Sequence, residues 1–204
     1  MNINKAIRKQ KKSYKRFMLI MDFIFFALPL AASLLFTDRV PLFYILYLIV
    51  IEVLIILAIV AKINYENLKF TTNNYRIKIV SGIRRDKINI ICNKVVFVHV
   101  ENIIRKSDRE RDFIIILIVS STFRSKRMIP INEKFLRGHP YAAFQYQKIK
   151  ILNPEKEYAF TIIKKGKLYK YELLDTIYKS CVYATFSEEA IDKIKEYRNS
   201  LLDK

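Results

Sequence analysis

The chain has 204 residues and carries 37 lysine and arginine residues against 19 acidic residues, which gives a formal net charge of +18 at pH 7. Its three glycines lie too far apart to form a glycine-rich phosphate-binding loop. Its two cysteines and two distant histidines lack the spacing of a metal-binding motif, so neither a cofactor nor a metal site is expected.

Two apolar runs of twenty residues dominate the N-terminal part of the chain, at positions 17–36 and 42–61. Because an α-helix rises about 1.5 Å per residue, each run covers roughly the 30 Å hydrocarbon thickness of a bilayer. The alternative is a pair of buried helices in a soluble bundle, but such helices carry a polar stripe on their outer face, which neither run has. The sequence therefore predicts a transmembrane helical hairpin over residues 17–61, retained as an anchor rather than cleaved as a signal peptide.

Basic residues predict the orientation of this hairpin. The segment 1–16 contains seven of them and no acidic residue, whereas the loop 37–41 has one arginine offset by one aspartate. Since short basic flanks stay on the cytoplasmic side, we expect a multi-pass protein of the cell (inner, cytoplasmic) membrane with both termini in the cytoplasm. The net charge of +13 over residues 62–204 either favours an anionic inner leaflet or only follows the positive-inside bias and aids solubility.

One ionisable residue interrupts each apolar run, Asp22 in the first and Glu52 in the second. Asp22 lies near the cytoplasmic end and can reach the headgroups. Glu52 lies near the midplane, where a charged carboxylate costs about 3 kcal/mol, so it should be protonated or paired. It marks either a proton or ion path or a contact with another helix. The second interpretation is favoured because a single hairpin cannot enclose a path.

From residue 66 onward, apolar and polar residues alternate as they do in half-buried strands. A run of seven apolar residues at 113–119 is too short for a bilayer and is typical of a central strand buried on both faces. The full set of strands predicted up to residue 131 is 68–70, 77–79 (after an Asn73–Asn74 turn), 87–92, 95–100, 113–119 and, at an edge, 126–131.

The remaining third of the chain is predicted to combine a hairpin, a strand and a terminal helix. Asn132 caps a short helical turn that Gly138 ends, and an irregular segment continues to Pro154. The hairpin pairs residues 158–163 with 167–174 around a turn at 164–166, and a further strand covers 177–186.

A C-terminal amphipathic helix is predicted from Ser187, which can cap it, and two glutamates follow in the first turn. Its apolar stripe, which includes Ile191, Ile194 and Leu201, indicates a helix docked on the sheets.

The stretch 68–100 carries a family resemblance. It reads LKFTTNNYRIKIVSGIRRDKINII and then KVVFVHV: a short strand, a polar turn, a second strand that ends at Ser81–Gly82, a basic third strand and one rich in valine. Placed after two predicted membrane helices, this pattern resembles the bacterial membrane-flanking pleckstrin-homology-like (PH-like) domains. The resemblance implies a mainly-β cytoplasmic domain over residues 66–204, folded as a bent antiparallel sandwich closed by a C-terminal amphipathic helix. It also implies a binding or scaffolding module, with no catalytic residue to carry over.

Two clusters of basic residues fall at predicted strand turns and are the candidate lipid- or partner-binding sites. Exposed turns that share one rim of a sandwich can hold anionic headgroups, although exposed turns are often charged without a ligand. The candidate residues are Arg84, Arg85 and Lys87 in the first cluster and Arg124, Lys126 and Arg127 in the second.

No enzyme signature emerges from the chain. A Ser-His-Asp arrangement would have to use His99, which is expected at the surface or rim of the sheet, or His139, which has no partner nearby in sequence. Alternating lysine and tyrosine at 167–171 can suggest stacking on single-stranded nucleic acid, but the pattern is more simply one face of a hairpin with tyrosines at a wet boundary.

The first functional hypothesis is a non-enzymatic integral membrane protein that presents a basic PH-like domain, as a scaffold or regulatory module, to a partner protein or to anionic lipid. The second is a subunit of a membrane transport or secretion complex, with Glu52 at a helix–helix interface and a protein partner or a second copy alongside. A membrane-tethered nucleic-acid binder is the third and least favoured.

Overall fold

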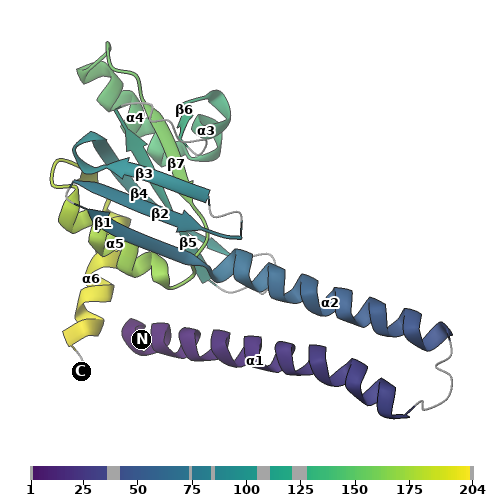
Figure 1. Ribbon diagram of the computed structural model, residues 1–204. Helices are drawn as coiled ribbons and strands as arrows, with labels where there is room; N and C mark the ends of the chain where they lie inside the picture. The colour runs from purple at the N-terminus through teal and green to yellow at the C-terminus, as the bar shows by residue number, and fades with distance from the viewer. Residues whose placement is uncertain are drawn as a thin grey trace.

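The computed structural model describes residues 2–35, 42–73, 75–83, 86–104, 111–120 and 128–202. Two long helices, α1 (Ile3–Leu35) and α2 (Leu42–Glu66), lie side by side and project from a domain built of two β-sheets and shorter helices (Figure 1). Both are long and apolar enough to cross a membrane, and only 6% of the apolar window of either helix is buried. They are therefore not the core helices of a soluble domain.

Helix α1 is longer than the predicted span. It begins at Ile3, so the basic segment forms the first turns of the same helix that carries the first apolar run. Ile3 is fully buried, and Ile7, Gln10 and Tyr14 follow it on the same half-buried face at a spacing of three to four residues. This face packs against α6 (Glu188–Leu202), which brings the two ends of the chain close together (Figure 1).

The first sheet is an antiparallel meander of β1 (Leu68–Asn73), β2 (Arg76–Ser81) and β3 (Asp86–Ile91). On β2 and β3 the isoleucines are buried and the residues between them are exposed, which confirms the predicted strands and their alternation. The inward side chains are Ile77, Ile79, Ile88 and Ile90.

The second sheet has five strands in the order β6-β7-β5-β4-β8, in which only β4 and β8 pair in parallel. Its longest members are β4 (Val95–Ile104), reached from β3 through the short helix η1 (Cys92–Lys94), and β5 (Arg111–Val119). β5 lies at the centre and is buried on both faces from Phe113 to Val119, as predicted. The short strand β6 (Ile129–Pro130) lies at an edge, also as predicted, and β7 (Ala159–Ile163) and β8 (Thr185–Phe186) complete the sheet.

The second sheet lies between two hydrophobic layers. Val98, Val100, Ile115 and Leu117 face the first sheet, together with α6 and α5 (Tyr169–Ser180). The opposite face carries Phe97, Ile114, Ile116 and Ile118, and it is covered by α3 (Glu133–Gly138) and α4 (Pro140–Leu152).

Two sequence predictions about local structure are wrong. Residues 140–152, expected to be irregular, form α4, which Pro140 opens at its first position. The strand predicted at 167–174 and most of the one predicted at 177–186 are replaced by α5, and only Thr185–Phe186 is extended. The tyrosines and leucines here alternate over a short window, but Leu174 and Ile177 join Tyr171 on one buried helical face.

The predicted helix ends are confirmed. The Asn132 Oδ1 atom accepts a hydrogen bond from the Phe135 N–H at 2.9 Å, and α3 ends at Gly138. Ser187 caps α6 by accepting from the Ala190 N–H at 3.3 Å. Ile194 is buried in the core against the sheets, so α6 is docked as the sequence predicted.

Candidate functional site

Five of the six basic residues predicted to bind a ligand lie outside the described residues: Arg84, Arg85, Arg124, Lys126 and Arg127. Lys87 is exposed on β3, opposite Val80 of β2. Whether the two clusters share a rim therefore stays a prediction.

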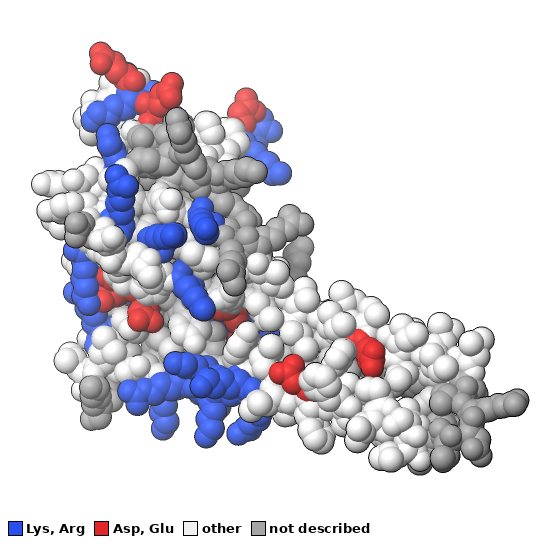
Figure 2. Space-filling view, viewed as in Figure 1, with Lys and Arg blue, Asp and Glu red and all other residues white. Residues whose placement is uncertain are grey.

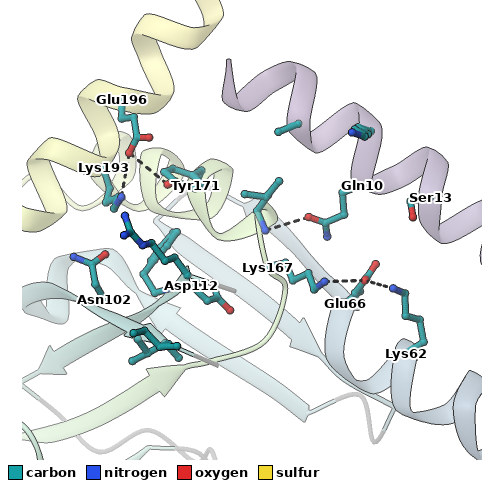
Figure 3. A pocket seen from close by; sticks show the side chains of 17 residues that line it. Gln10, Ser13, Lys62, Glu66, Asn102, Asp112, Lys167, Tyr171, Lys193 and Glu196 are labelled. Carbon is teal, nitrogen blue, oxygen red and sulfur yellow. Dashed lines mark hydrogen bonds and ion pairs between the residues drawn. The ribbon is translucent and has the colours of Figure 1, made fainter. Parts of the chain in front are cut away.

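A cavity of about 1100 Å³ lies where the helix pair meets the domain. We call it the junction cavity. It is bounded by the first turns of α1, the end of α2, the adjoining ends of β4 and β5, the loop before α5, and α6 (Figure 3). Its polar lining residues are Lys9, Gln10, Ser13, Lys62, Glu66, Asn102, Arg111, Asp112, Lys167, Tyr171, Lys193 and Glu196.

The three carboxylates of the cavity wall are all paired, and two of them are paired within the cavity itself. The Glu66 carboxylate forms ion pairs with the ammonium groups of Lys62, at 2.8 Å, and Lys167, at 3.5 Å (Figure 3). The Glu196 carboxylate forms an ion pair with the Lys193 ammonium at 3.1 Å. Burial acts to lower the pKa of Lys193, but the hydrogen bond to Glu196, together with Tyr171 and the charge of Glu196, outweighs it, so this pKa is raised and the ammonium stays charged.

The third carboxylate belongs to a buried network that joins α2 to the domain. The Lys170 Nζ atom donates to Asp112 Oδ1 at 2.7 Å, and the Tyr65 hydroxyl donates to Asp112 Oδ2 at 3.2 Å. Lys170 also donates to the carbonyl of Phe113 and, at 3.3 Å, to that of Lys164. Since its side chain is fully buried, these bonds fix the last turn of α2 against β5 and α5.

Basic side chains outnumber acidic ones around the junction cavity by five to three. Lys9 on α1 and Arg111 on β5 are exposed, and neither forms an ion pair with any described residue. The cavity wall therefore keeps two cations that no carboxylate neutralises in the described part of the chain.

Gln10 is the one lining residue with a buried donor that lacks an acceptor among the described residues. Its Oε1 atom accepts a hydrogen bond from the Leu168 N–H at 3.3 Å, which fixes the orientation of the amide. The Nε2 atom then points into the space between α1 and the loop that carries Lys167 (Figure 3).

A second hollow of about 480 Å³ adjoins the junction cavity and shares Glu66 with it. Lys11, Lys15 and Lys69 line it, together with Tyr14 and Tyr169. Burial, with the nearby carboxylates Glu66 and Glu172, raises the pKa of Tyr169, so its hydroxyl remains a hydrogen-bond donor at neutral pH.

His99 is buried, which corrects the expectation that it lies at the surface or rim. It faces opposite to Val98 and Val100 as the alternation requires, but α3 and α4 cover that face of the sheet. Its Nδ1 atom lies 2.9 Å from the Ser187 hydroxyl, and Glu101 lies 3.8 Å from its Nε2 atom. The other Glu101 oxygen lies 2.7 Å from His139 Nδ1, so a carboxylate joins the two histidines.

We interpret His99, Ser187, Glu101 and His139 as a structural network. The Ser187 hydroxyl near His99 also accepts a hydrogen bond from the Ala190 N–H and so caps α6. No group of three or more His, Cys, Asp or Glu residues in the described ranges has a geometry that could hold a metal ion.

Cys92 and Cys181 are both free and buried. Burial and, to a smaller extent, the adjacent Cys92 raise the pKa of the Cys181 thiol far above its ordinary value. The Cys181 thiol therefore stays protonated, and both cysteines are buried side chains of the core.

Asp22 and Glu52 lie on the apolar helices, Asp22 exposed and Glu52 half-buried. Neither forms an ion pair within the described part of the chain.

Comparisons of the chain with protein-family models, curated proteins and solved structures found no match.

Proposed function

We propose that this protein is a non-enzymatic membrane module that anchors itself through the α1–α2 hairpin and binds anionic phospholipid headgroups of the cytoplasmic leaflet. The observation that carries the proposal is the continuity of α1. One helix bears an apolar run that can span a bilayer and a basic segment docked on the domain, so the domain is held at a fixed height over the leaflet.

The basic side chains of α1 support this role because all seven are exposed. Figure 2 shows Lys and Arg gathered on this side of the domain, next to the apolar helix pair. A lysine or arginine near an anionic leaflet contributes about 1 kcal/mol, and this contribution fades beyond a Debye length of about 8 Å. At about 1.5 Å per residue, Arg16 and Lys12 lie within about 8 Å of a hydrocarbon edge at Phe17, at the depth of the headgroups, whereas Arg8 and Lys5 lie about 14–18 Å from that edge and farther from the lipid charge.

Lipid analysis of the full chain tests the proposal. The protein is exchanged from vesicles of phosphatidylglycerol and phosphatidylcholine into mild detergent, and the retained lipids are quantified by mass spectrometry. We expect phosphatidylglycerol to be enriched at 0.15 M salt and the enrichment to fall at 0.5 M. The pair Lys12→Gln with Arg16→Gln should reduce it more than the matched distal pair Lys5→Gln with Arg8→Gln. Retention at the supplied ratio, whatever the salt, contradicts the proposal.

The finer fold assignment, a PH-like bent sandwich, belongs to the same proposal. Two antiparallel layers packed face to face and a docked C-terminal helix support it. Helices α3, α4 and α5 lie between strands β6, β7 and β8, where the predicted PH-like plan has strands alone. A binding role that used the tyrosines of 167–171 for nucleic-acid stacking has less support, since Tyr171 is buried.

A second candidate function is a subunit of a membrane complex, and the acids of the hairpin favour it. A carboxyl group in hydrocarbon gains most when another helix satisfies it, and neither Asp22 nor Glu52 forms an ion pair within the described chain. Light scattering of the full chain in mild detergent tests this function. A stable oligomer or complex that Glu52→Leu disrupts would support it, and a monomer unaffected by the substitution would contradict it.

A further inference from the structure

We infer that the junction cavity is a specific site for one phosphate-bearing anion, with the Gln10 amide and the Lys9 and Arg111 side chains as its donors. This inference rests on the proposed function and deepens it, because it names the ligand chemistry of the surface between anchor and domain.

The first argument is the unsatisfied donor of Gln10. A buried polar group without a partner costs about 1–3 kcal/mol, so such groups usually have a partner. Exchanging the two ends of the amide does not remove the deficit, because Oε1 is needed to accept the Leu168 N–H at 3.3 Å. The Nε2 atom is buried in the cavity wall, so a rotation of the Gln10 side chain has to expose it before it donates to an acceptor in the cavity.

The second argument is the charge left over in the wall. The carboxylates of Glu66, Asp112 and Glu196 are each held by a lysine of the protein, at 2.8, 2.7 and 3.1 Å. Lys9 and Arg111, which have no such partner among the described residues, come from α1 and β5, two different boundaries of the same cavity. A neutral amide donor with two cations selects an anion rich in acceptor oxygens, and a phosphate group is the commonest such anion.

The third argument is position and size. Glu66 lies five residues beyond the end of the second apolar run, and Ser13 four residues before the first, so this side of the cavity lies about 6–8 Å outside the hydrocarbon, at the headgroup layer of a bilayer. The donors Gln10 and Lys9 lie seven and eight residues before the first run, about 10–12 Å outside the hydrocarbon, so the anion that they bind extends from the headgroup layer toward the domain. A volume of about 1100 Å³ exceeds what a bare phosphate ion fills and suits a phosphate with an attached polar group. A lipid headgroup and a soluble phosphorylated compound share this chemistry.

Titration of the detergent-solubilised full chain tests the site with three probes: dioctanoyl phosphatidylglycerol, inorganic phosphate and, as a neutral control, dioctanoyl phosphatidylcholine. We expect saturable binding of one phosphatidylglycerol per chain and at least tenfold weaker binding of phosphatidylcholine. Competition by millimolar phosphate identifies a soluble phosphate compound as an equal source of the ligand, and its failure to compete identifies the lipid as the source. Absence of saturable binding for both anionic probes overturns the inference.

Gln10→Glu is the most informative variant. It keeps an oxygen to accept the Leu168 N–H and replaces the Nε2 donor by a second oxygen of a negatively charged carboxylate, so the lost donor and the added repulsion together should reduce affinity at least tenfold. Arg111→Gln, at an exposed position, gives a second variant without a packing change and should weaken binding as well. Lys5→Gln changes the net charge by the same one unit at an exposed position of α1 outside the cavity and should change affinity less than twofold. Unchanged affinity in both cavity variants contradicts the inference.

The outcomes also separate this site from the proposed function. One outcome is that the double variant Lys12→Gln with Arg16→Gln loses general phosphatidylglycerol enrichment and keeps the saturable site. That result supports both the lipid-binding function and the cavity site. Enrichment that persists while no saturable site exists rejects the cavity site alone. A saturable site for inorganic phosphate in a protein that shows no lipid enrichment rejects the lipid function alone.

Discussion

The buried ion pair of Lys170 could not be predicted from the sequence. In the sequence it is one lysine in an alternating stretch of lysine and tyrosine, which indicates an exposed face. In the structure its side chain is fully buried and its ammonium meets Asp112, which is 58 positions earlier in the chain. No local pattern reports such a pair, because its members approach only after α5 has docked on β5.

We predict that Asp112→Ala destabilises the folded protein by about 3–5 kcal/mol, because it leaves a buried lysine without its counter-ion. The double change Asp112→Ala with Lys170→Met should recover part of this loss, since the uncompensated charge is gone. Chemical denaturation of the full chain in detergent measures both. A double variant no more stable than Asp112→Ala alone would show that the ion pair has no role in stability.

His99 predicts a pH dependence of stability. Burial lowers its pKa below 6.5, and the nearby carboxylates Glu101 and Glu189 only partly oppose this, while His139 adds to it. The unfolded chain therefore binds a proton more readily than the folded one. The stability that neutral His99 contributes is complete above about pH 6.5 and is lost as the pH falls below that value.

Thermal unfolding at pH 7.5, 6.5 and 5.5 checks this prediction. The midpoint should fall with pH, and it should fall less in His99→Asn, whose side chain does not titrate. The Tyr141 ring, with its centroid 4.7 Å from that of His99, and the Ser187 hydroxyl, 2.9 Å from Nδ1, also face the imidazole. An equal fall in both proteins would assign the pH dependence to other groups.

At the scale of elements, the first six strands and the last helix could be predicted because their signals are local: alternation, turn residues and a capping serine. β7 was also predicted, at 158–163. Helix α4 was not predicted, and α5 was predicted as a strand because a short alternating stretch is compatible with both a strand and a helix. What decides between them is non-local. The Gly166 N–H donates to the Tyr65 carbonyl at 3.1 Å, and the backbone at Gly166 and Lys167 has positive φ, of 110° and 46°. This loop turns the chain from β7 into α5.

We predict that Gly166→Ala destabilises the protein by at least about 1–3 kcal/mol, the usual cost of one residue held in such a conformation. An added Cβ atom would also approach the Leu68 Cβ atom to 2.6 Å. Gly138→Ala is the matched control, since nothing lies within 4 Å of its Cβ position, and it should be neutral or stabilising by up to about 1 kcal/mol. Equal unfolding midpoints for the two variants would refute the role given to the loop.

The docking of the first turns of α1 was not predicted either, although Ile3, Ile7, Gln10 and Tyr14 have the spacing of one helical face. The seven basic residues around them indicated a solvated segment, and the partner face on α6 lies at the other end of the chain. The junction cavity depends on this docking, so its residues could not be collected from the sequence.

Ile3→Ala should therefore cost about 2–4 kcal/mol, as for other fully buried isoleucines, and should accelerate hydrogen exchange over residues 3–16. Leu19→Ala, at a position 70% exposed on the same helix, is the control and should leave that exchange unchanged. Exchange in the unaltered protein as fast as in an unstructured peptide would mean that the segment is not docked.

At the scale of the whole molecule, the account depends on a hairpin that crosses the membrane and a domain that stays in the cytoplasm. Most apolar side chains of α1 and α2 are exposed in the structure, with Leu34 and Phe43 74% and 80% exposed. A bilayer is the environment that would bury them, and the positive-inside rule predicts that the basic first turns of α1 lie on its cytoplasmic side.

Cysteine labelling in intact cells tests this claim most directly. The native Cys92 and Cys181 are at most 1% exposed and serve as a silent background. One variant carries Asp38→Cys in the predicted external loop, and the other carries Leu152→Cys at a position of the domain that is 79% exposed. We predict that a membrane-impermeant maleimide labels position 38 in intact cells and position 152 only after the cells are opened. Labelling of position 152 from outside intact cells, or recovery of the full chain in the aqueous supernatant without detergent, would contradict the account.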